Sequence, residues 1–302
     1  MLAPKETKMV AYPWPAPSDN RQLPTWTGRG FRLGNDVVPV LSYKGDSSGW
    51  TDELTALHED LAGSDHPIEL ASREHALQEL RTHVQGERPV ILEVGCSSGF
   101  MLRHIIEHMP QAMIIGADYA RGPLEKLAAE LPEVPLIQFD LTKCPLPAGT
   151  LDAVIALNVL EHIPDDRAAA REICRILKPG GTAVIEVPAG PTLFDAYDIR
   201  LMHYRRYALN SAVRMLEEVG LKVLKGSHLG FFVYPLFWLT KQRNKRYLGE
   251  ANIEQERVIN RQIRNTRASR LLDLSLRMEL ALGKWISYPF GIRCLLTCQK
   301  SA

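Results

Sequence analysis

The chain has 302 residues, of which 45% are hydrophobic and 24% charged, and its formal net charge at pH 7 is +1. This balance is typical of a globular protein with a substantial core, and the near-neutral charge argues against a large nucleic-acid footprint. The first residues contain no apolar stretch of the kind found in signal peptides. The longest apolar run, Leu229 to Leu239, is far shorter than the ~20 residues that a membrane-spanning helix needs.

The cysteines indicate the redox environment. They are five in number and scattered, and no two are spaced as a CxxC pair: Cys96, Cys144, Cys174, Cys294 and Cys298. An odd number without paired spacing predicts neither a disulfide framework nor a zinc knuckle. We therefore expect a cytoplasmic protein.

The N-terminal part is expected to lie outside the central fold. Residues 1 to about 45 are rich in proline and aromatic residues and show no period of 2 or 3.6. They predict an arm that lies on the body or is partly mobile, and its Trp14 and Trp26 could cover the active site or a neighbouring subunit. Apolar spacing over residues 50–84 predicts two helices. Residues 1–84 are thus interpreted as an arm and helices that cover the active site.

From Pro89 onward, short apolar runs alternate with helical patterns. Strands are predicted at 90–94, 112–117, 134–139, 151–157 and 182–187, with helices at 100–108, 123–130 and 166–177. Buried parallel strands read as continuous apolar runs, so the pattern predicts an α/β fold with a parallel sheet covered on both faces. Residues 85–228 are assigned to this core.

The remaining chain adds to the same sheet after a long excursion. A helix is predicted at 210–219, a strand at 221–224 and a last strand at 292–298. Between these two strands, residues 229–290 are apolar and basic with a helical pattern. They are interpreted as a helical insertion that acts as a lid or an interaction surface, and residues 291–302 return to the core as its final strand.

The turn after the first core strand, Glu93 to Gly99, is a candidate ligand loop. Gly95 permits a tight turn, and Gly99 lets the backbone approach a ligand where the next helix begins. Free amides at that helix terminus can accept a pyrophosphate or a methionine carboxylate. Asp118 ends the second strand and could accept hydrogen bonds from ribose hydroxyls, and Asp140 ends the third, within reach of an adenine amine. A tight turn without a ligand is the alternative.

Taken together, these residues resemble a known family. The runs Ile91–Cys96, Leu157–Pro164 and Leu177–Gly181, with Asp118, Asp140 and Pro188 in the right order, are similar to the class I S-adenosylmethionine-dependent methyltransferases. The resemblance covers roughly residues 85 to 225 and disfavours NAD. It implies a Rossmann-like, seven-stranded, mostly parallel sheet with the last strand antiparallel. It also implies S-adenosylmethionine as the cofactor.

The resemblance further implies which residues hold the cofactor: Glu93, Gly95, Cys96, Ser97, Gly99, Asp118, Tyr119, Asp140, Leu141 and Asn158. The family usually carries a glycine where this chain has Ser97, and a side chain there restricts the backbone φ angle. A later segment, Phe194 to Tyr207, and the Pro289-Phe290-Gly291 run are similar to a bacterial subgroup of uncertain substrate.

Catalytic candidates follow the fourth and fifth strands. Methyl transfer requires a nucleophile about 3 Å from the methyl group, and a base where the nucleophile is a hydroxyl. His203 is the leading candidate for a base or substrate contact, although a lone histidine is more often structural. Glu161 and His162 could share in catalysis or only organise their loop. With His203 they could also bind a divalent metal, but relatives with such a site carry a second glutamate where this chain has Asn158, so no metal is predicted.

Substrate contacts are predicted at the four residues that follow His203: Tyr204, Arg205, Arg206 and Tyr207. The two arginines could clamp a carboxylate or phosphate, or form salt bridges with Asp195 or Asp198. The two tyrosines could line the pocket or pack in the core. The apolar run 229–239 could be a lid, a dimer surface, a core helix or a membrane-surface anchor.

The expected function is methyl transfer to an oxygen or nitrogen of a small molecule, such as a natural product, a sugar or a lipid-linked intermediate. The alternatives are a non-catalytic S-adenosylmethionine-binding protein and a metal-assisted O-methyltransferase that uses Glu161 and His162. A small-molecule acceptor is the expected partner, and no nucleic acid is expected. A membrane surface reached through residues 229–246 and a homodimer are further candidates.

Overall fold

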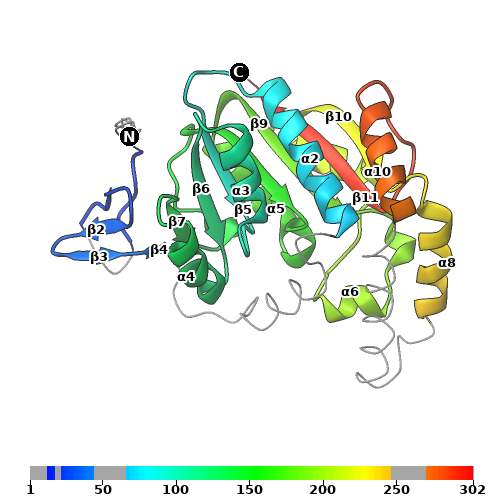
Figure 1. Cartoon of the computed structure of the whole chain (residues 1–302), viewed down its shortest axis with the longest axis horizontal. Coiled ribbons are helices and arrows are strands. Elements are labelled where there is room, and N and C mark those ends of the chain that lie inside the picture. The colour runs from blue at the N-terminus through cyan, green and yellow to red at the C-terminus, as the bar shows by residue number, and fades with distance from the viewer. Residues whose placement is uncertain (1–11, 18–21, 44–65, 246–269, 302) are drawn as a thin grey trace.

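The computed structural model describes residues 12–17, 22–43, 66–245 and 270–301 (Figure 1). They contain two sheets. A small antiparallel sheet is formed by β1 (Thr25–Trp26), β2 (Phe31–Leu33) and β3 (Asp36–Val38). The large sheet has eight strands in the order β10-β11-β9-β8-β5-β6-β7-β4.

Six strands of the large sheet are mutually parallel: β4 (Val40–Ser42), β5 (Val90–Val94), β6 (Met113–Asp118), β7 (Leu136–Gln138), β8 (Leu151–Leu157) and β9 (Leu177–Pro188). At the other end, β11 (Arg293–Lys300) runs antiparallel to β9 and to β10 (Leu221–Leu229). The Rossmann-like α/β fold with a reversed final strand is therefore confirmed.

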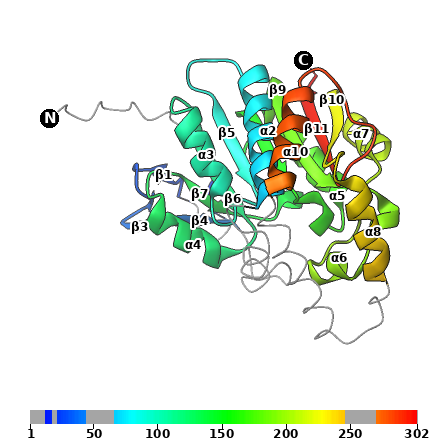
Figure 2. The ribbon, with the colours of Figure 1, turned by 45° about the vertical axis from the view of Figure 1, so that its right-hand side comes forward.

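Helices cover both faces of this sheet (Figures 1 and 2). On one face lie α2 (Pro67–His83), α3 (Phe100–His108) and α4 (Arg121–Glu130), and on the other α5 (Asp166–Ile176) and α7 (Leu209–Glu218). The short α6 (Ala196–Arg200), α8 (Tyr234–Asn244) and α10 (Arg270–Leu282) lie toward the β10 side. Two separate hydrophobic clusters result, one on each face of the sheet.

Helix α5 shows how the sequence sets these bounds. The Asp165 side chain accepts a hydrogen bond from the Ala168 amide and caps the helix at its start. Ala169, Ile173 and Ile176 recur on one side and are fully buried. The helix ends at Ile176, within a residue of the predicted end, because the chain then enters β9 ahead of a proline and two glycines.

The N-terminal arm differs most from expectation. Its strands β1 to β4 were not predicted, because segments of two or three residues are too short to show an alternating pattern. Strand β4 pairs in parallel with β7, so the sheet has eight strands and not seven. The described arm lies on the body: Trp14 packs edge-on against Phe31 at 4.9 Å, and the Tyr12 hydroxyl lies 2.8 Å from Thr150 Oγ1. Thr150 precedes β8, so this contact is at the amino end of that strand.

The segments 50–84 and 229–239 differ in part from their predicted structure. Of the two helices expected over residues 50–84, the second is α2, and residues 44–65 lie outside the described part of the chain. The run 229–239 does not form a core helix. It contains the end of β10 and the start of α8, where Leu236 is 71% exposed. Within the described residues, no helix combines the length and hydropathy needed to cross a bilayer.

Candidate active site

Four neighbouring parallel strands carry the predicted ligand residues at their carboxyl ends. The strands are neighbours in the order β7, β6, β5, β8. Asp118 is the last residue of β6, and the other three residues lie just beyond a strand: Asp140 after β7, Gly95 after β5 and Asn158 after β8. Because the strands are parallel, their carboxyl ends meet at one edge of the sheet, which is where open α/β sheets bind ligands. The structure thus brings together the residues that the sequence predicts to hold a cofactor.

The two glycines of the ligand loop are needed for different contacts. Gly95 has a φ of +73°, and a Cβ there would lie 2.7 Å from Val159 Cγ2. Gly99 has a φ of +72° and precedes α3 as its N-cap, where a Cβ would lie 2.6 Å from Leu127 Cδ1. Side chains at either position would clash, and Gly99 gives α3 no side-chain cap of its own.

Ser97 stands where the family usually has glycine, and it adopts a glycine-like backbone. Its φ is +45°, in the left-handed region. The Ser97 amide donates a hydrogen bond of 2.9 Å to Asp118 Oδ2. An L-residue in this region costs about 1–2 kcal/mol, so the bond to Asp118 helps to hold a strained turn. The expected restriction on φ therefore shows up as strain and leaves the loop geometry intact.

The two aspartates are oriented by hydrogen bonds from nearby residues. Asp118 is buried, and its Oδ1 accepts a hydrogen bond of 2.9 Å from the Ala120 amide. Asp140 is half-buried, and its Oδ1 accepts hydrogen bonds from the amide and hydroxyl of Thr142. An ionised carboxylate has about four acceptor positions, so both groups can bind further donors.

Three other predicted cofactor residues have mainly structural surroundings. Cys96 and Leu141 are buried in the two hydrophobic clusters, and burial raises the pKa of the Cys96 thiol well above its usual range. Tyr119 is half-buried, and its carbonyl accepts a hydrogen bond from Gln138. Through their side chains, Cys96 and Leu141 can shape the loop but present little surface to a ligand.

Asn158 directly follows β8 and has a φ of +54°, in the left-handed region. Its amide side chain donates to Glu186 Oε1 at 3.0 Å, and the same oxygen accepts from Ser72 at 2.9 Å and from Arg293 at 2.6 Å. Arg293 also pairs with Glu69 of α2. Sequence reasoning missed this buried network. The available signal was a single charged residue in each of two predicted strands, Glu186 in 182–187 and Arg293 in 292–298.

The catalytic candidates come together beside this edge. The 3-10 turn Leu160–His162 places Glu161 and His162, and the chain after α6 places His203. The rings of His162 and His203 lie edge to face at 4.7 Å. One ligand atom from each of Glu161, His162 and His203 lies within 4.8 Å of the others. The Tyr204 amide donates to the Glu161 carbonyl at 2.8 Å, which ties the two segments together.

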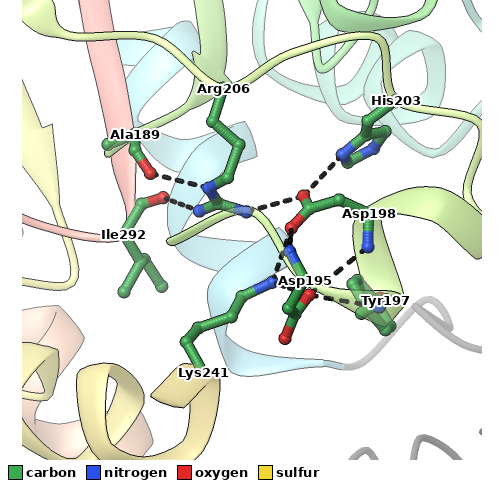
Figure 3. Close-up of polar contacts among 8 residues, drawn as sticks. All are labelled: Ala189, Asp195, Tyr197, Asp198, His203, Arg206, Lys241 and Ile292. Atoms are coloured by element: carbon green, nitrogen blue, oxygen red, sulfur yellow. Dashed lines mark hydrogen bonds and ion pairs between the residues drawn. The ribbon is translucent and has the colours of Figure 1, made fainter. Parts of the chain in front are cut away.

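His203 is oriented by a buried carboxylate (Figure 3). Its Nδ1 lies 2.8 Å from Asp198 Oδ1, and its side chain is only 7% exposed. Burial lowers the pKa of His203, and the charge of Asp198 offsets this only in part. The imidazole is therefore neutral near pH 7. Because Nδ1 faces the carboxylate, Nε2 remains for another partner.

Asp198 is itself held by two cations (Figure 3). Arg206 donates to Asp198 Oδ1 at 2.9 Å, and Lys241 of α8 donates to Asp198 Oδ2 at 3.0 Å and to Asp195 Oδ1 at 2.7 Å. Burial alone would raise the pKa of Asp198, but the hydrogen bond from His203 and the charges of Arg206 and Lys241 hold it well below its usual value. Asp198 is therefore an anion at neutral pH.

The predicted substrate contacts are largely occupied by internal partners. Arg206 is buried and bonds Asp198 and the carbonyls of Ala189 and Ile292, so the salt-bridge interpretation holds for this residue. Arg205 pairs at 2.7 Å with Asp166, and not with Asp195 or Asp198. Tyr207 is buried and donates to Asp166 at 2.8 Å. Tyr204 is 54% exposed, more than the other three, and Arg205 is half-buried.

Glu161 is unusual because it is fully buried without a counter-ion bonded to it. Its exposed fraction is 0%, and neither carboxyl oxygen has a hydrogen-bond partner on another described residue. Burial raises its pKa from 4.5 to about 8. Glu161 is therefore a neutral carboxylic acid at pH 7, and its two oxygens are unused polar atoms next to His162 and His203.

Comparisons with known proteins find methyltransferases that are similar to the core of this chain. Residues 92–185 match a family model described as a methyltransferase domain. A probable S-adenosylmethionine-dependent methyltransferase of Mycolicibacterium smegmatis is 30% identical over 44% of this chain and 52% of the relative. A trans-aconitate 2-methyltransferase of Azoarcus sp. is 31% identical over 37% of this chain and 43% of the relative. Residues 92–185 are thus a methyltransferase domain, and these relatives are named as methyltransferases.

The likeness of this methyltransferase domain extends to solved structures. Phosphoethanolamine N-methyltransferase 2 of Haemonchus contortus, in complex with S-adenosyl-L-methionine, superposes with a TM-score of 0.50 at 15% identity. That match covers 86% of this chain and 61% of the other, and it shows a shared fold. The chain spans about half the length of the two curated relatives, 52% and 43%.

The edge of the methyltransferase domain fits S-adenosylmethionine. Glu93 is buried, and its Oε2 has no hydrogen-bond partner among the described residues, which suits the ammonium group of a methionine moiety. Burial, with the nearby Asp118, raises the pKa of Glu93 well above its usual value, and a bound ammonium would oppose this rise. The amino end of α3, where Gly99 provides no side-chain cap, suits the carboxylate, and Asp118 suits the ribose.

The strain at Ser97 can be tested by substitution. We expect Ser97→Val to lower the free energy of unfolding by at least about 1 kcal/mol, because a β-branched residue tolerates the left-handed region worse than serine does. Ser97→Gly should be tolerated. Urea denaturation measures both, and Ser98→Val is the matched control because Ser98 has no positive φ. Equal losses for Ser97→Val and Ser98→Val would contradict the interpretation.

The buried carboxyl of Glu161 predicts a pH dependence of stability. Between the unfolded pKa of 4.5 and the folded pKa of about 8, the unfolded chain loses the proton while the folded chain keeps it, so folding weakens as pH rises. We expect Glu161→Gln to gain stability over the native protein, by a few kcal/mol, between about pH 5 and pH 8. Denaturation at several pH values measures this, with the exposed Glu133→Gln as control. A difference that does not change with pH would contradict it.

Proposed function

We propose that this protein transfers a methyl group from S-adenosylmethionine to an oxygen or nitrogen of a small molecule, with His203 as the general base. The observation that carries the proposal is the hydrogen bond between His203 and Asp198, both buried, beside the carboxyl edge of the methyltransferase domain. The pattern of a base oriented by a buried carboxylate is common to enzymes that deprotonate a hydroxyl.

The cofactor supplies a methyl group already activated by its sulfonium. The chain must then bind the acceptor, orient it and remove its proton. His203 Nε2 is placed to accept that proton, because its Nδ1 is engaged by Asp198. Asp198 stabilises the imidazolium that forms, and Arg206 and Lys241 keep Asp198 ionised. The protonated carboxyl of Glu161 adds no second negative charge and can donate a hydrogen bond to the acceptor.

The side chains near this edge favour a small acceptor of limited charge. The buried arginine near the site, Arg206, is already satisfied by three internal acceptors. Recognition of the acceptor therefore falls to Glu161, His162, His203 and the exposed Tyr204. Relatives are named for acceptors as different as trans-aconitate and malonyl-[acyl-carrier protein], so we propose a class of acceptor and not one compound.

One observation favours a second candidate, metal-assisted O-methylation. Glu161, His162 and His203 each offer a ligand atom within 4.8 Å of the others, and a carboxylate orients His203 as is usual for metal-binding histidines. A divalent ion there would lower the pKa of an acceptor hydroxyl. The two candidates separate on one test: activity that survives prolonged dialysis against EDTA favours the base, and loss restored by Mn²⁺, Mg²⁺ or Zn²⁺ favours the metal.

Substitution of His203 tests the base directly. We expect His203→Ala to lower kcat by about 10²–10⁴ for a hydroxyl acceptor, with S-adenosylmethionine binding unchanged. The native kcat/KM should fall on the acid side, at a pH below the ordinary histidine value of about 6.5, because burial lowers the pKa of His203 and protonation removes the base. The measurement is transfer of labelled methyl to a panel of acceptors, with His108→Ala, on the outer part of α3, as control.

Three outcomes would contradict the assignment of the base. They are full activity of His203→Ala, the same acid limb of kcat/KM in the native protein and in His203→Ala, and loss of cofactor binding together with loss of activity. A protein that binds the cofactor but methylates nothing in a broad panel of acceptors would favour the non-catalytic alternative.

A further inference from the structure

Helix α10 carries two apolar faces, and only one of them is buried. Leu272 and Leu276 are buried, and with Leu280 they join a cluster that includes Ala71 of α2 and Leu229 of β10. The opposite face is a stripe of exposed apolar side chains, with exposed fractions of 81%, 56%, 52%, 45% and 87%: Leu271, Leu274, Met278, Leu282 and Trp285. Their spacing of three or four residues places them along one side of the helix.

This outer stripe rests on a fixed support. The Trp285 amide donates to the Leu282 carbonyl at 2.9 Å, so the helical turn continues past the end of α10. Tyr288 then donates through its hydroxyl to the Glu279 carbonyl at 2.9 Å and stacks on Phe231 at 5.1 Å. The exposed stripe therefore belongs to an ordered surface. Monomeric soluble proteins rarely expose a contiguous apolar surface of this kind without a partner.

Helix α8 also has one buried side and one exposed apolar side, and it lies on the same side of the molecule as α10 (Figures 1 and 2). Its inner side is fixed by Lys241, which reaches into the Asp195 and Asp198 pair (Figure 3). Its outer side exposes Leu236 by 71%, Trp238 by 46% and Leu239 by 41%. We call the exposed side chains of α8 and α10, with Trp285, the α8–α10 face.

Charge on this surface is strongly biased to one sign. The exposed or half-exposed basic residues in 231–245 and 270–290 are Arg243, Lys245, Arg270, Arg277 and Lys284. The acidic residues in the same ranges are Asp273, which pairs with Arg277, and Glu279, which is buried and bonded to the Gly230 amide. The α8–α10 face is therefore apolar with a basic surround.

We propose that the α8–α10 face docks on an anionic lipid bilayer. Exposed Leu, Met and Trp side chains on a helix lying in the interface plane insert into the boundary between headgroups and acyl chains, and the surrounding Arg and Lys are attracted to anionic headgroups. A second copy of the chain fits less well. A symmetric dimer through this face would place the basic residues of the two copies against each other.

Docking would set how the candidate site is oriented relative to the bilayer. Lys241 of α8 contacts the same Asp198 that orients His203. Membrane docking would therefore place the candidate site next to the bilayer and fix the helix that supports it. Docking itself depends only on the exposed side chains and their charges, and it holds whether or not methyl transfer is the activity.

Vesicle binding by the whole protein tests the proposal. We expect the protein to sediment with vesicles of phosphatidylcholine and phosphatidylglycerol at low salt, to bind pure phosphatidylcholine at least about tenfold more weakly, and to be released by added salt. The triple variant Leu271→Ser, Leu274→Ser and Trp285→Ser should lower the partition coefficient at least about tenfold. All three positions are highly exposed, so folding should not depend on them.

Matched control substitutions are available outside the α8–α10 face. Leu23→Ser with Val37→Ser removes two apolar side chains that are 73% and 55% exposed in the N-terminal region, and it should leave vesicle binding unchanged. Charge is tested in the same way, because Arg270→Glu with Lys284→Glu should weaken binding to anionic vesicles, whereas Lys222→Glu on β10 should not.

Several results would overturn the proposal. One is that the native protein does not sediment with anionic vesicles at low salt. Another is that the triple variant binds as well as the native protein. A third is a native dimer, measured by light scattering, that becomes a monomer in the triple variant without any vesicle binding, because the α8–α10 face would then be a subunit interface.

Discussion

The parallel alignment of β7, β6, β5 and β8 is the constraint on which the candidate site depends. It brings the ligand loop, Asp118, Asp140 and Asn158 from separate parts of the sequence to one edge of the sheet. Each strand end is then fixed by local bonds, such as that from Ser97 to Asp118. The catalytic candidates follow the next positions along the same edge, after β8 and β9. The position of the site is thus a result of sheet topology, and its chemistry depends on the side chains placed there.

A second constraint is the burial of charge around Asp198. A buried carboxylate is costly unless it is paired and hydrogen-bonded, and Asp198 receives bonds from His203, Arg206 and Lys241. Asp198 thus contacts the segment after α6 and helix α8 directly. It is connected to the start of β11 through Arg206, which also donates to the Ile292 carbonyl. Removal of a single partner would leave an uncompensated charge, so the network favours one arrangement of the site over looser ones.

The sequence predicts the core well, because buried parallel strands and amphipathic helices leave strong local patterns. Strands β5, β6 and β8 and helices α3 and α5 lie close to their predicted bounds, whereas β9 begins at Leu177, five residues before its predicted start. It predicts short edge elements poorly, as β1 to β4 show. The grouping of Glu161, His162 and His203 was foreseen as an alternative, and the structure brings them together. Long-range partners were mostly not foreseen: the bonds from Lys241 to Asp195 and from Arg293 to Glu186 join residues far apart in sequence, and no local pattern specifies them.

The central claim is that the carboxyl edge of this sheet holds S-adenosylmethionine through Asp118. Isothermal titration of S-adenosylmethionine and S-adenosylhomocysteine into the native protein and into Asp118→Ala tests it most directly. The account predicts binding of both ligands in the micromolar range to the native protein, and a loss of at least about tenfold in the variant, since one carboxylate serves both the ribose and the Ser97 turn. Absence of binding to a well-folded native protein, or equal affinity in the variant, would contradict it.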